Sequence, residues 1–143
     1  MNYIYWALLG MCGYSATTLF VKLAVKEGKF SSFVILSVAV SIVVTSVWII
    51  TAVRGDFKSL TAQTIRSTAM LWSIATGIVL ALAVISLFRA LSLGPASVVV
   101  PVYGMFIVGG AVLGMIFLHE PVTFNKILGI LLAVAGIYFI TKP

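Results

Sequence analysis

The chain has 143 residues and a formal net charge of +6; 62% of its residues are hydrophobic and only 8% are charged. Average soluble domains carry about 25% charged residues, so this composition excludes an ordinary soluble protein. The positive charge indicates contact with anionic lipid headgroups rather than with nucleic acid. One histidine, one cysteine and three acids offer no disulfide framework, metal site or nucleophile–base set. We therefore expect no enzymatic activity, no metal and no cofactor.

Five apolar runs fill the chain almost from end to end. A helix of about 20 residues rises roughly 30 Å, which matches the hydrocarbon core of a bilayer. The sequence therefore predicts an all-α membrane protein, a bundle of five transmembrane helices with short loops in one domain over residues 1–143. The predicted spans cover residues 3–25, 30–53, 68–88, 95–118 and 122–141. The first run is too long for a signal peptide, so we expect a multi-pass protein of the cell (cytoplasmic) membrane.

A polar stripe marks the first span, where Tyr14, Thr18 and Lys22 follow one another at four-residue intervals on one helix face. Lys22 lies about one turn from the next loop. Its ammonium group can therefore extend to the headgroups, or it can attract an anionic group into the membrane. Arg89, at the end of the third span, is open to the same two interpretations. Trp72 lies near the start of that span.

The connections between the spans are short, except for residues 54–67, where a short interfacial helix is expected at 59–66. Five spans place the two termini on opposite sides of the membrane. The basic residues divide four to five between the sides: Arg54, Lys58, Arg66 and Lys126 against Lys22, Lys26, Lys29, Arg89 and Lys142. Topology normally follows a clear Lys/Arg excess on the cytoplasmic side. Either the lysines of the first loop fix that side inside, or copies insert in both orientations (dual topology).

The fourth span contains Pro101, whose ring leaves the carbonyl of Ser97 without its normal helical donor. In lipid, that carbonyl must be satisfied by a neighbour, water or a substrate. Gly104 follows, so we expect a kink with Tyr103 at the bend. Such a kink is either a static feature or a moving wall of a binding site.

In the fifth span, Gly129, Ala133 and Gly136 lie on a similar helix face, where small residues allow another helix to approach closely. The partner is either another span or a second copy of the chain. Before this span, Glu120 is expected to act as a cap at the helix N-terminus, and a role in proton coupling is the alternative.

The segment from Ser86 to Ile140 carries four motifs: Phe88–Leu91, Gly94–Pro101, Leu118–Pro121 and Gly129–Gly136. In this order and spacing they resemble the EamA family of the drug/metabolite transporter superfamily. The resemblance implies a single EamA-type repeat, whereas typical members carry two repeats with the substrate cavity between them. It therefore implies an antiparallel homodimer or a paired homologous subunit. The chain also resembles the small multidrug-resistance proteins, whose membrane-embedded Glu is replaced here by Tyr14.

We therefore expect an exporter of small neutral, zwitterionic or amphiphilic metabolites that works by alternating access in a dimer. The residues predicted to contact the substrate are Tyr14, Thr18, Trp72, Pro101, Tyr103 and Gly104. One alternative is a subunit that flips a phospholipid or a lipid-linked sugar, in which Lys22 and Arg89 would contact the lipid phosphate. A second alternative is a membrane scaffold that transports nothing.

Overall fold

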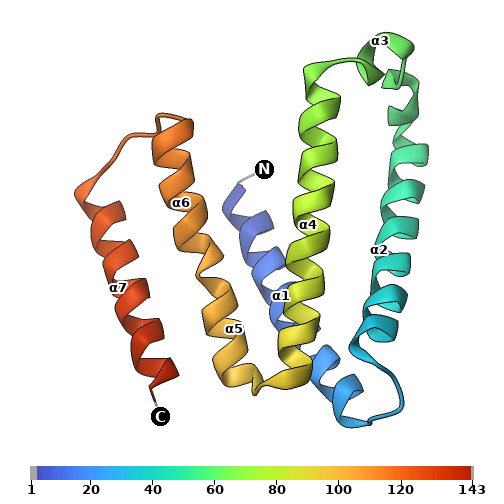
Figure 1. Ribbon diagram of the computed structural model, residues 1–143. Coiled ribbons are helices and arrows are strands. Elements are labelled where there is room, and N and C mark those ends of the chain that lie inside the picture. Colours follow the sequence, from blue (N-terminus) through green and yellow to red (C-terminus); the bar gives the residue numbers. More distant parts are fainter. Residues whose placement is uncertain (1–2, 143) are drawn as a thin grey trace. The chain divides into compact units, whose positions relative to one another are not determined.

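The computed structural model describes residues 3–142, which form helices and no strand (Figure 1). The helices are α1 (Tyr3–Lys26), α2 (Ser32–Arg54), the 3-10 helix η1 (Asp56–Ser59), α3 (Ala62–Ile65), α4 (Thr68–Leu93), α5 (Ala96–Gly104), α6 (Phe106–Phe117) and α7 (Phe124–Thr141). Among the described residues, five stretches are long and apolar enough to cross a membrane, namely α1, α2, α4, α5 with α6, and α7. The predicted all-α membrane fold is confirmed.

The observed boundaries differ from the predicted ones in two places. The third span continues to Leu93 rather than ending at residue 88, so Arg89 lies inside α4 and not in the connection after it. A long basic side chain near a helix end can reach water without ending the helix, which explains the difference. The fourth span is divided into α5 and α6, and Met105 lies between them.

Helix α2 ends at a glycine C-cap, where the connection to α4 begins. Gly55 adopts a left-handed conformation with φ of 71°, and its N–H group donates to the carbonyl of Ala52 at 3.0 Å. Glycine is favoured in this conformation because it has no Cβ. The short helix expected at 59–66 is present as the four-residue helix α3, and the 3-10 helix η1 precedes it. Thr61 caps α3 by accepting a hydrogen bond from the N–H group of Thr64.

The chain forms two compact units. One contains the described residues up to Thr18 together with those from Leu93 onward, and the other is Leu19–Ser92. In the second unit, the buried apolar side chains lie near the C-terminal ends of α1 and α4 and the N-terminal end of α2. They are Val21, Leu36, Leu87, Phe88 and Leu91. In the first unit, α7 contacts both α5 and α6.

Most apolar side chains on the five spans are exposed. In the most apolar stretches of α2 and α7, no residue is buried inside the chain. In water such a surface would be very unfavourable, because apolar area is expelled from water. The exposed surface therefore matches a protein whose helices are covered by hydrocarbon.

Candidate functional site

The fourth span is broken near its middle. Pro101 lies inside α5, which ends at Gly104. The N–H group of Met105 donates to the carbonyl of Val102 at 3.2 Å, only three residues back, and Gly109 then donates to Met105 at 3.1 Å to begin α6. The expected interruption is thus present, and the break lies at Met105, directly after the expected bend. At such a break, the last carbonyls of one helix and the first N–H groups of the next lose their regular helical partners.

Two predicted site residues meet beside this break. Tyr103, the penultimate residue of α5, and Tyr14 of α1 bring their phenol groups close to each other. Its ring also packs edge-to-face against Phe106, with 5.7 Å between ring centroids. Tyr103 is partly buried, and Tyr14 is 46% exposed. The first and fourth spans therefore bring two phenols together where the helical ladder is interrupted.

Phe106 was not among the predicted site residues. Its signal in the sequence is its position three residues after Tyr103, which places two side chains on neighbouring parts of a helix face. A break between the two residues makes that inference uncertain from sequence alone.

The other predicted substrate contacts are less closely tied to the break. The hydroxyl of Thr18 donates to the carbonyl of Ser15 on its own helix at 2.8 Å. Trp72 belongs to the second unit, near the start of α4. Its ring is 71% exposed and has no ring or polar contact with the described residues. Trp72 therefore stays a prediction.

Lys22 has a defined partner in the second unit. Its Nζ atom donates to the carbonyl oxygen of Leu91 at 2.7 Å, near the C-terminal end of α4. The regular helical donor for that carbonyl would be the N–H group of residue 95, which is a proline and has none. Lys22 thus donates to a carbonyl whose regular helical donor is missing. Arg89 is exposed, and its guanidinium has no polar partner among the described residues.

The small residues of α7 are exposed. A Cβ atom added at Gly129 or Gly136 would meet nothing within 4 Å. The partly covered residues of the helix include Ile130 and Ile137, which lie about 90° around the helix from the stripe formed by Gly129, Ala133 and Gly136. The stripe is therefore not packed against another part of its own unit.

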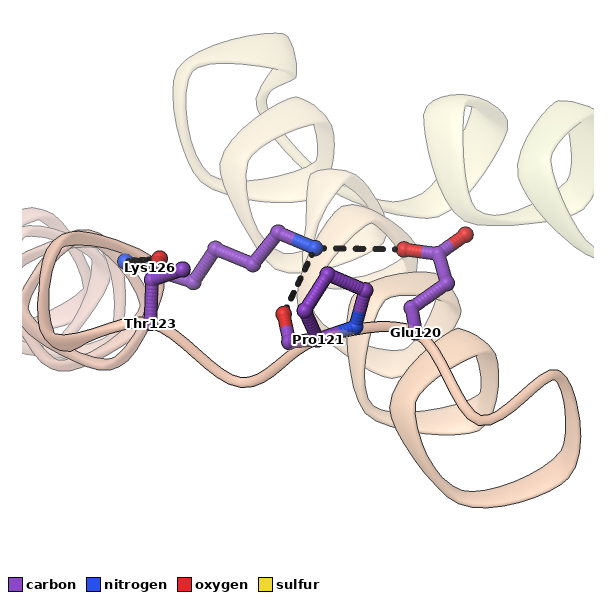
Figure 2. A network of polar contacts seen from close by, with 4 residues as sticks. All are labelled: Glu120, Pro121, Thr123 and Lys126. Atoms are coloured by element: carbon purple, nitrogen blue, oxygen red, sulfur yellow. Dashed lines mark hydrogen bonds and ion pairs between the residues drawn. The ribbon is translucent and has the colours of Figure 1, made fainter.

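The turn between α6 and α7 is held by a polar network (Figure 2). The side chain of Thr123 caps α7 by accepting from the N–H group of Lys126 at 3.3 Å. Nζ of Lys126 donates to Oε2 of Glu120 at 3.3 Å and to the carbonyl of Pro121 at 3.1 Å. The expectation that Glu120 caps α7 is wrong, because the shorter Thr123 side chain lies at the cap position. The Glu120 carboxyl group instead lies over Gly114, where an added Cβ would be 3.4 Å away.

Among residues 3–142, no group of three or more His, Cys, Asp or Glu side chains could hold a metal ion. In a comparison with known protein families, a model of the EamA-like transporter family matches residues 1–142. No curated protein and no solved structure matches the chain.

Proposed function

The chain belongs to the EamA-like transporter family, and we propose that it forms one half of an exporter of small neutral, zwitterionic or amphiphilic metabolites. The observation that carries this proposal is the pairing of Tyr14 with Tyr103 beside the helix break at Met105. Interrupted membrane helices offer backbone polar groups to a ligand at membrane depth. Phenols add hydrogen-bonding hydroxyls and apolar ring faces to the same place.

The chemistry of these residues supports the substrate class. The residues near the break carry hydroxyls, rings and backbone groups but no charged side chain. A strongly charged substrate without a counter-charge would lose much of its hydration and gain little in return. A neutral or zwitterionic molecule can instead use carbonyls, N–H groups and phenols. An amphiphilic molecule can also place its apolar part against the rings.

The second half of the transporter is supplied by another chain. Five spans make an antiparallel partner the inverted equivalent of the first, which is the arrangement from which many transporters are built. The exposed stripe at Gly129, Ala133 and Gly136 is suited to close contact with a helix of that partner. The partner is either a second copy in the opposite orientation or a homologous subunit.

The test is flux in reconstituted vesicles. The purified chain is placed in proteoliposomes, alone or with a homologous subunit, and export of labelled amino acids, betaine and neutral sugars is measured. The variant Tyr103→Ala should abolish flux of the transported compound while insertion is retained. The matched control is Tyr138→Ala, at an exposed tyrosine of α7. Equal flux in both variants would refute the site. Translocation of a fluorescent phospholipid without metabolite flux would support the lipid-flipping alternative instead.

A further inference from the structure

The connection between α2 and α4 folds back against the end of α2. This connecting segment, residues 54–67, contains η1 and α3 and belongs to the unit Leu19–Ser92. The ring of Phe57 in η1 packs edge-to-face against that of Trp48, with 5.8 Å between ring centroids. Trp48 lies about 9 Å along the axis from the last residue of α2. Tryptophan side chains are typical of the membrane–water interface, so this contact indicates that η1 lies at the interface.

The large apolar side chains of the connecting segment are exposed. Phe57 is 40% exposed, and Leu60 and Ile65 are each 53% exposed. Such side chains are unfavourable in water, because apolar area is expelled from it. At a membrane surface, the same side chains can enter the boundary between headgroups and acyl chains. The connecting segment therefore has the apolar part of an interfacial anchor.

The hydroxyl groups of the connecting segment bind its own backbone. Ser59 donates to the carbonyl of Asp56 at 2.6 Å, and Thr64 donates to the carbonyl of Ser59 at 2.6 Å. Ser67 donates to the carbonyl of Thr64, also at 2.6 Å. Backbone groups that are satisfied in this way depend less on water. The connecting segment can therefore lie close to the hydrocarbon.

The connecting segment is positively charged. It carries three basic residues, Arg54, Lys58 and Arg66. Its one acid is Asp56, so its net charge is +2. The side chains of Lys58 and Arg66 are exposed and form no hydrogen bond or ion pair with the described residues. Their charges are therefore available to a ligand of opposite sign.

We propose that the connecting segment is a binding surface for anionic phospholipids of the membrane that holds the chain. Phe57, Leu60 and Ile65 lie at the acyl boundary, and Lys58 and Arg66 contact headgroup phosphates. A guanidinium can bind a phosphate through two parallel hydrogen bonds, and an ammonium binds it as a point charge. A lipid fits this combination better than an acidic soluble protein does, because both ends of the segment continue into membrane spans. The proposal does not depend on what the chain transports.

The test uses Trp48 as a reporter of the neighbouring lipid, because its ring is 65% exposed. The full chain with Trp6→Phe and Trp72→Phe is reconstituted in phosphatidylcholine that contains increasing amounts of brominated phosphatidylglycerol, which quenches tryptophan on contact. Quenching by brominated phosphatidylcholine gives the reference. We expect a preference of about fivefold or more for the anionic lipid. It should weaken in about 1 M salt, where the screening length is about 3 Å.

Equal quenching by the two brominated lipids would overturn the proposal and favour an acidic soluble partner. The variant Lys58→Gln combined with Arg66→Gln should abolish the preference. The matched control is Lys26→Gln combined with Lys29→Gln, which removes the same charge from the connection at the other end of α2. About 24 Å along the helix axis separates Trp48 from that end, so the control should keep the preference. Equal preference in the two double variants would also overturn the proposal.

A gain of charge gives a second test that does not depend on losing a side chain contact. The variant Asp56→Asn removes the one acid of the connecting segment and raises its net charge by one. It should strengthen the preference for phosphatidylglycerol severalfold, with the helical content by circular dichroism unchanged. An unchanged or weaker preference would contradict the role of charge in this surface.

Discussion

Lys22 should stabilise the protein through the carbonyl of Leu91, and the variant Lys22→Met tests this. The hydrogen bond is 2.7 Å long, and Leu91 is fully buried. Because residue 95 is a proline, no backbone N–H group can replace the ammonium as the regular helical donor. A hydrogen bond to a charged group contributes about 1.5–3 kcal/mol, and an unsatisfied buried carbonyl costs a similar amount. We therefore expect Lys22→Met to lower the free energy of unfolding by about 2 kcal/mol.

The measurement is unfolding in bicelles or mixed micelles, followed by steric trapping or by circular dichroism. The matched control is Lys26→Met, one turn further along α1, where the side chain is exposed. Loss of an exposed side chain of this kind should change stability by no more than about 0.5 kcal/mol. Equal stability of the two variants would refute the role assigned to Lys22. A loss of flux in Lys22→Met at unchanged stability would assign the ammonium to the substrate instead.

Two further predictions concern the site and the helix stripe. In a double-mutant cycle with Tyr14→Phe and Tyr103→Phe, the coupling energy should be about 0.5–1.5 kcal/mol, measured by unfolding, because the two hydroxyls lie close enough to interact. Additive effects would contradict the pairing. Gly136→Leu should change the free energy of unfolding of the isolated chain by no more than about 0.5 kcal/mol, because nothing lies within 4 Å of a Cβ atom added there. The same variant should weaken association with a partner, measured by energy transfer. Ala135→Leu, on a different face of α7, is its control, and equal association of both variants would exclude the stripe as the contact.

The five spans could be predicted because their signal is local. Length and continuous hydrophobicity identify a membrane helix without knowledge of its neighbours. The errors lie where a charged or capping side chain decides the end of a helix. Arg89 suggested a loop but lies within α4, and Glu120 suggested a cap but pairs with Lys126. Both residues have long side chains whose atoms end up far from their own backbone, so sequence position is a poor guide to their contacts.

The candidate site could be predicted only in part. Pro101 and Gly104 predict an interrupted helix, because Pro101 lacks a backbone N–H group and Gly104 lacks a Cβ atom. The pairing of Tyr14 with Tyr103 joins residues far apart in the chain, and it depends on packing that local pattern does not encode. The edge-to-face contact with Phe106 depends in turn on the geometry of the break.

Pro95 and Pro101 each remove a helical hydrogen-bond donor, but the two carbonyls that lose this donor differ in their partners. Each proline deprives a carbonyl four residues earlier, in Leu91 and Ser97, of its helical donor. Lys22 donates to the carbonyl of Leu91, whereas no side chain of the described residues donates to that of Ser97. In hydrocarbon, a carbonyl without a side-chain donor must be met by backbone, water or ligand. Lys22 thus donates to the carbonyl near the end of α4, whereas the carbonyl within the fourth span has no such side-chain donor, and this difference supports the proposal that a substrate binds beside Tyr103.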